Sequence, residues 1–89
     1  MSERPAPCRL IRLPAVQLLT GYKRTALYDH IEDGTMTESV SIGARAVAWP
    51  ENEIEAINRA RVAGADDDAV RALVRRLHAD RTAPLKEAA

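Results

Sequence analysis

The chain has 89 residues, 13 basic and 13 acidic, and a formal net charge of zero. This length suits one domain, and no apolar run approaches the roughly 20 residues that span a bilayer. Cys8 is the only cysteine, which excludes an internal disulfide and a cysteine metal cluster, and residues 1–7 lack the apolar core of a signal peptide. We therefore expect a cytoplasmic protein with no membrane anchor.

The charges are distributed unevenly along the chain. Residues 1–28 hold five basic residues and one acidic residue, whereas residues 29–68 hold three basic and ten acidic ones. From residue 69 on, five basic residues stand against two acidic ones. A neutral protein with this pattern can present a basic face to a partner, although ordinary solvated helix faces explain the pattern equally well.

The first predicted helix runs from Pro14 to Thr20, after a short apolar lead-in at residues 10–13. Pro14 suits a first helical position, and Val16 and Leu19 are available for a core. Gly21 suits the left-handed residue that ends such a helix.

A second helix is predicted to begin near Arg24 and to stop at Gly34. Leu27 and Ile31 are one helical turn apart and are expected to face inward together. Two short helices around a tight turn that contains glycine form the helix-turn-helix pattern, here between about Leu13 and Gly34.

From Thr37 on, apolar residues recur at every second position instead of at helical spacing. Alternation over residues 37–43 predicts a strand, residues 43–46 a turn, and residues 47–49 a return strand. A two-stranded hairpin is marginal by itself, so we expect its apolar residues to lie against the helices: Val40, Ile42, Val47 and Trp49. A helix-turn-helix followed by a hairpin is a winged arrangement.

Two further helices complete the predicted fold. Pro50 opens the third, with acidic residues in its first turn, where the helix dipole favours them, and Gly64 ends it. The fourth begins near residues 66–68 and carries a clear apolar stripe of Val70, Leu73, Val74 and Leu77. Three placements stay open for this helix: it can fold back on the domain, pair with a second copy or contact a recombinase.

At this point the residues resemble a known family. The run Arg12-Leu13-Pro14-Ala15-Val16, followed by Thr20 to Tyr28 and by Val40 to Trp49, resembles the AlpA family of phage-type regulators. The resemblance covers about residues 9 to 62. It implies a winged helix-turn-helix related to MerR-type and excisionase-type DNA-binding domains, mainly α with a small β-hairpin, with no catalytic residues to carry over.

The resemblance makes the start of the second helix the candidate DNA-reading segment. Arg24 can form a forked contact with guanine, and Thr25 can contact a phosphate or a thymine methyl; the alternative is a solvated first turn. Tyr28, one turn after Arg24, can bond a phosphate or pack half-buried under the wing. The acidic residues that follow, Asp29, Glu32 and Asp33, are expected to face away from the duplex.

Three more basic residues complete the candidate site. Lys23 and Arg12 are candidates for phosphate contacts, which need only charge and reach. Arg45, at the hairpin tip, can enter the minor groove or merely protect a strand edge from aggregation. Trp49 is expected in the core, and His30 and His78 are expected to be structural or surface residues rather than metal ligands. No cofactor is expected.

The sequence therefore predicts a non-enzymatic protein that binds specific double-stranded DNA, as a transcriptional regulator or an excisionase in a mobile element. The predicted organisation is a flexible segment 1–8, a winged helix-turn-helix domain 9–63, a C-terminal helix 66–81 for packing or self-association, and a flexible tail 82–89. An integrase or recombinase is a possible partner. The alternative is a protein-interaction module that uses the acidic surface and the C-terminal helix. The resemblance also implies a bacterial protein that is associated with DNA in the cytoplasm.

Overall fold

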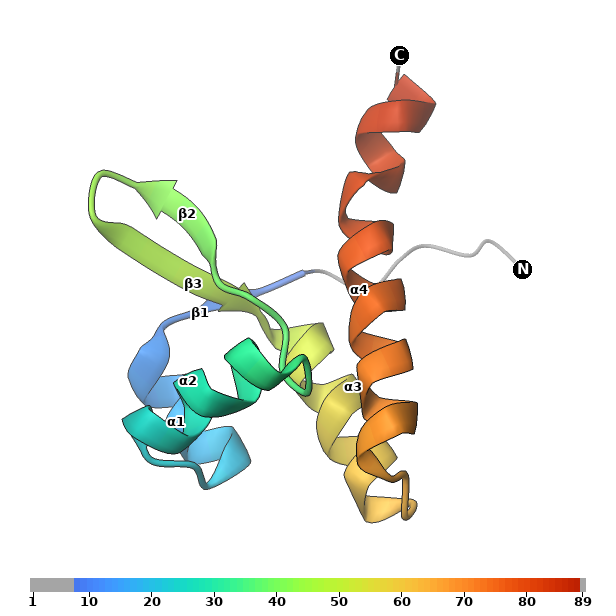
Figure 1. Cartoon of the computed structure of the whole chain (residues 1–89). Helices are drawn as coiled ribbons and strands as arrows, with labels where there is room; N and C mark the ends of the chain where they lie inside the picture. Colours follow the sequence, from blue (N-terminus) through green and yellow to red (C-terminus); the bar gives the residue numbers. More distant parts are fainter. Residues whose placement is uncertain (1–7, 89) are drawn as a thin grey trace.

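Two short helices joined by a tight turn open the helical part of the computed structural model, which describes residues 8–88 (Figure 1). Helix α1 spans Leu13–Thr20 and helix α2 spans Arg24–Asp33. Gly21 and Gly34 follow them with φ angles of 77° and 84°, a left-handed conformation that glycine adopts without a Cβ clash. The predicted helix-turn-helix is confirmed.

The wing is an antiparallel hairpin of β2 (Val40–Gly43) and β3 (Ala46–Pro50), with Val40 opposite Ala48. The predicted hairpin is therefore confirmed. Strand β1 (Leu10–Ile11) pairs with the other edge of β3, which gives the strand order β1-β3-β2. Sequence reasoning treated this segment only as an apolar lead-in, because two residues show no alternation.

The apolar residues of the wing were predicted to lie against the helices, but only some of them do. Ile42 and Val47 are exposed by 44% and 39%, whereas Ala48 and Trp49 are fully buried. The hairpin projects away from the helices (Figure 1), so only its base lies over the core. The prediction is correct for Trp49, which lies at that base, and wrong for Ile42 and Val47.

Helix α3 spans Glu51–Val62 and helix α4 spans Asp67–Ala88. Asp66 caps α4, because its Oδ1 accepts a hydrogen bond from the N–H of Ala69 at 2.8 Å. The predicted helix ended at residue 81, but α4 continues through Ala88. Residues 82–88 include alanine, leucine, lysine and glutamate, which have high helix propensity, and α4 continues past Pro84. Of the predicted flexible segment 1–8, residues 1–7 lie outside the described residues.

The core lies between the helical pair, the base of the wing and the two later helices. Its fully buried side chains include Trp49, Leu27, Val16, Ile54 and Val70. The apolar stripe of α4 packs on this core, so of the three placements left open the structure shows the helix folded back.

One residue of α1 departs from the predicted core. Leu19 is 44% exposed. At this end of α1 the side chain of Asn58, on α3, donates a hydrogen bond to the Leu19 carbonyl oxygen at 3.0 Å. Among the described residues, no helix combines the length and the apolar character that crossing a membrane requires.

Candidate nucleic-acid interface

The first turn of α2 presents two side chains that are arranged in advance of any ligand. Arg24 and Tyr28 lie one helical turn apart, and the guanidinium carbon of Arg24 is 5.7 Å from the centroid of the Tyr28 ring. The Tyr28 ring also meets Trp49 edge to face, with 6.4 Å between ring centroids, and stays 39% exposed. Tyr28 therefore packs against Trp49 at the base of the wing and keeps an accessible surface, and its contact with a phosphate stays a prediction.

Thr25 lies on the outermost face of α2, and two carboxylates share that face. Leu27 and Ile31 point toward the core, so the residues at helical positions i, i+4 and i+7, Thr25, Asp29 and Glu32, face solvent together. Neither carboxylate has an ion-pair partner among the described residues. Asp29 and Glu32 therefore lie on the same solvent-facing side of α2 as Thr25, and their orientation relative to a bound duplex stays a prediction.

Basic residues occupy the N-terminal ends of both helices of the pair. Arg12 is the residue before α1 and Lys23 the residue before α2; both are exposed, and neither helix has an acidic residue in its first turn. A helix N-terminus carries a partial positive charge, so a cation there is electrostatically unfavourable and an anion is favourable. This concentration of positive charge suits phosphate groups.

Arg45 lies at the tip of the wing in an unusual backbone conformation. Its φ angle is 60°, and it is the only non-glycine residue with a positive φ among the described residues. Such a conformation costs on the order of 1 kcal/mol and is often found at functional positions. The side chain is exposed at the end of the hairpin.

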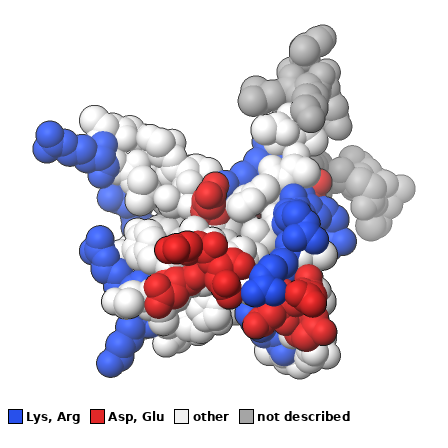
Figure 2. Space-filling view, viewed as in Figure 1, with Lys and Arg blue, Asp and Glu red and all other residues white. Residues whose placement is uncertain are grey.

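Four of the candidate residues form one cluster, and the other two lie apart from it. The start of α2 holds Lys23, Arg24, Thr25 and Tyr28, whereas Arg12 lies directly before α1 and Arg45 at the tip of the wing. Figure 2 shows basic side chains that project from the wing and from the side of α1 and α2. Acidic side chains gather over α2, between these projections and α4. A duplex can meet these separate positive projections only if it spans from α2 to the wing.

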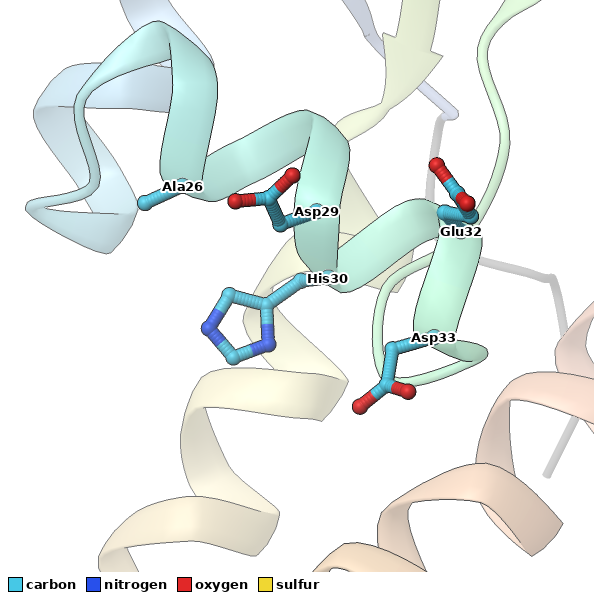
Figure 3. Close-up of a pocket in the computed structure, with 5 residues that line it drawn as sticks. All are labelled: Ala26, Asp29, His30, Glu32 and Asp33. Carbon is cyan, nitrogen blue, oxygen red and sulfur yellow. The ribbon is translucent and has the colours of Figure 1, made fainter.

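The acidic side of α2 forms an open depression of about 520 Å³ (Figure 3). It is lined by Ala26, Asp29, His30, Glu32 and Asp33. The Nδ1 atom of His30 lies 2.7 Å from the hydroxyl oxygen of Thr35, and its ring stacks on Tyr22 with 4.4 Å between centroids. The imidazole thus has a structural role, as expected. Within the described residues no group of side chains could hold a metal ion.

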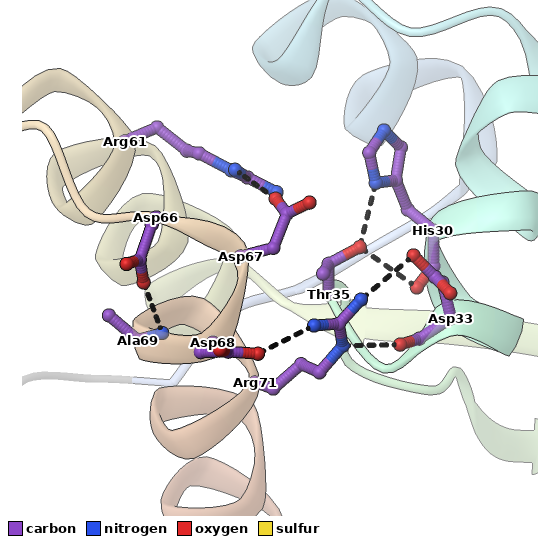
Figure 4. A network of polar contacts seen from close by, with 9 residues as sticks. All are labelled: His30, Asp33, Thr35, Arg61, Asp66, Asp67, Asp68, Ala69 and Arg71. Carbon is purple, nitrogen blue, oxygen red and sulfur yellow. Dashed lines mark hydrogen bonds and ion pairs between the residues drawn. The ribbon is translucent and has the colours of Figure 1, made fainter.

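Sequence reasoning missed Arg71, which joins α4 to the end of α2 (Figure 4). Its Nε donates to the Asp33 carbonyl oxygen at 3.0 Å, and its other nitrogens pair with the carboxylates of Asp33 and Asp68. Partial burial alone would lower the pKa of Arg71, but the two carboxylates raise it above its ordinary value. A cation at a helix C-terminus also complements the helix dipole, so Arg71 stabilises the last turn of α2.

The same network closes the turn between α3 and α4. Arg61 donates to Oδ1 of Asp67 at 2.8 Å, and this hydrogen bond lowers the pKa of the Asp67 carboxyl group. Asp67 is exposed, so this pair serves mainly to order the turn. Periodicity predicts helix starts, but not which arginine meets which carboxylate.

Comparison with known proteins gives two matches. Residues 9–60 match the family model described as prophage CP4-57 regulatory protein (AlpA). Over 56 residues, 63% of this chain, the sequence is 38% identical to the uncharacterized protein ORF88 of Enterobacteria phage P4, and the match spans 64% of that protein. No solved structure matches. The family match contains the helix-turn-helix and the wing and ends before α4.

Proposed function

The chain belongs to the AlpA family of phage regulatory proteins, and from this premise we propose that it binds specific sequences of double-stranded DNA. The observation that carries the proposal is the placement of basic side chains at the helix N-termini of α1 and α2 and at the wing tip. These three positions can contact the phosphate backbone while the first turn of α2 reads bases. The proposed activity is binding, with no catalytic step.

In the proposed complex, α2 enters the major groove with its N-terminal turn. Arg24 and Thr25 contact base edges or thymine methyl groups, and the Tyr28 hydroxyl bonds a phosphate. Lys23 and Arg12 contact phosphates beside the groove. Arg45 holds the wing against the minor groove or the backbone.

Replacing Arg24 by alanine is expected to weaken binding to the specific site by about 1–3 kcal/mol, because a forked contact with a base is lost. Duplex binding is measured with genomic fragments at two salt concentrations, and wild-type affinity is expected to fall steeply as salt rises.

The matched control for this experiment is Arg59→Ala. Arg59 carries the same charge, its side chain is 84% exposed, and it lies on α3 away from the candidate site. Its removal is expected to leave specific binding nearly unchanged. Equal affinities for wild type and Arg24→Ala would contradict the assignment of α2 as the recognition helix.

The carboxylates on the outer face of α2 are expected to oppose non-specific binding. Changing Asp29 to asparagine and Glu32 to glutamine together removes two negative charges that face the phosphates in the proposed complex. Affinity for random duplex is expected to rise by roughly 0.2–1 kcal/mol per charge. Titration of random and specific fragments measures the change. If the affinity rises for neither fragment, this face of α2 lies away from the DNA.

Two biological roles use the same DNA-binding chemistry. The protein can act as a transcriptional regulator, or as an excisionase that assists an integrase or recombinase. Self-association on DNA through residues 66–81 is part of this proposal. Since the apolar stripe is buried, a second copy would meet the exposed face of that helix, which includes Arg75 and Arg76. A footprint longer than one domain can cover would support several bound copies, and one of single-domain length would contradict them.

The acidic surface over α2 favours one alternative, a module that binds a protein through this surface and α4. The two functions differ in a simple observation. Absence of duplex binding by the wild type at low salt would reject the DNA-binding proposal and favour the protein partner.

A further inference from the structure

Glu38, two residues before the wing begins, is held by two side chains of α4. The backbone N–H of Glu38 donates to Nε2 of His78 at 3.0 Å, and the Glu38 carbonyl oxygen accepts from Arg81 at 2.6 Å. His78 and Arg81 are three residues apart and therefore project from one face of the helix. Both backbone polar groups of Glu38 are thus bonded to α4 rather than to a neighbouring strand.

Arg81 is itself fixed in place by a buried carboxylate. Its Nε and a terminal nitrogen donate to the two oxygens of Glu53 at 2.8 and 2.6 Å, and the side chain of Glu53 is only 4% exposed. Arg81 cannot swing away without leaving this carboxylate buried and unpaired, which is strongly unfavourable. The side chain that contacts Glu38 is therefore held in a fixed position by its ion pair between α4 and α3.

The base of the wing is held on both sides, besides its own hairpin pairing. On one side β1 pairs with β3. On the other, the segment before β2 is held by α4 at Glu38 and by Trp49, whose Nε1 donates to the Thr37 carbonyl oxygen at 3.1 Å. The outer part of the hairpin carries exposed Ile42 and Val47 and gains little support from packing. The direction of the wing therefore depends on these attachments at its base.

We propose that His78 and Arg81 are positioning residues for DNA binding, because they fix the angle of the wing and so the place of Arg45 relative to α2. The inference rests on the proposed function. It assigns a role to α4, which lies outside residues 9–60 that match the family. The helix acts on the DNA through the wing and makes no contact with DNA in this role.

His78 offers a clean test because its ring is only half buried and its acceptor can be replaced. Glutamine retains an oxygen that can accept from the Glu38 N–H, whereas leucine fills similar space and cannot accept. In the DNA-free protein, His78→Leu is expected to speed hydrogen exchange of the wing amides by roughly tenfold, with α1 and α2 unchanged, and His78→Gln to restore protection. Unchanged exchange in the wing of His78→Leu would overturn the inference without involving DNA.

A double-mutant cycle then tests whether the contacts of α4 with Glu38 affect DNA binding. His78→Leu is expected to weaken specific binding roughly fivefold in the wild-type background and to have little further effect when Arg45 is already alanine. In the Arg24→Ala background its fivefold effect is expected to remain. An equal loss in the Arg24→Ala and Arg45→Ala backgrounds would overturn the role through the wing. Failure of wild-type protein to bind any duplex would instead reject the proposed function. The exchange result would still report whether α4 holds the wing through Glu38.

Discussion

Replacing Trp49 by alanine is expected to lower the free energy of unfolding by about 3–5 kcal/mol, the usual loss for a large aromatic residue removed from a core. Trp49 is fully buried, pairs through β3 with Ile11 and meets the ring of Tyr28. The substitution leaves a cavity where the wing, β1 and α2 join, and the Thr37 carbonyl oxygen loses its donor. Urea unfolding followed by circular dichroism measures the change.

A second substitution separates the two contributions of Trp49. Trp49→Phe keeps most of the apolar volume and removes only the indole N–H, so its loss is expected to be smaller than that of alanine. Val62→Ala serves as a control, because Val62 is 89% exposed and its truncation is expected to change stability by no more than about 0.5 kcal/mol. A loss below about 1 kcal/mol for Trp49→Ala would contradict the central place of this residue in the core.

Replacing Arg81 by alanine is expected to destabilise the protein by about 3–5 kcal/mol, because the buried carboxylate of Glu53 loses its partner. The Glu53 side chain is 4% exposed and that of Arg81 is 22% exposed, so water screens this pair poorly. The same denaturant titration measures the effect, with Arg75→Ala as a control that removes an exposed arginine from the same helix.

The double variant Glu53→Met with Arg81→Met tests the reason for this loss. Replacing both members of a buried ion pair by apolar side chains of similar size is often neutral or stabilising. The double variant is therefore expected to be much more stable than Arg81→Ala. If the two variants prove equally unstable, the loss comes from packing around Arg81 and not from an unpaired charge.

The candidate site was largely readable from local patterns. Arg24 and Tyr28 were placed on one face by their spacing, and Gly21 and Gly34 marked the ends of their helices, because helix period and left-handed termini depend on neighbouring residues. The same period already placed Asp29 and Glu32 beside Thr25. The prediction that they face away from a bound duplex rests on electrostatic repulsion by phosphates and not on helical spacing.

The sequence by itself determined the helix-turn-helix, the hairpin, the start of each later helix and the apolar stripe of α4, since each follows from residues within a few turns of one another. Only the tertiary structure decided that β1 joins the sheet and that the outer wing stays exposed. It alone showed Arg71 on Asp33 and His78 and Arg81 on Glu38. Those partners lie 38 to 43 residues apart. Side chains that distant meet because the buried stripe of α4 brings them together, and periodicity, which depends only on near neighbours, carries no record of which distant surfaces will touch.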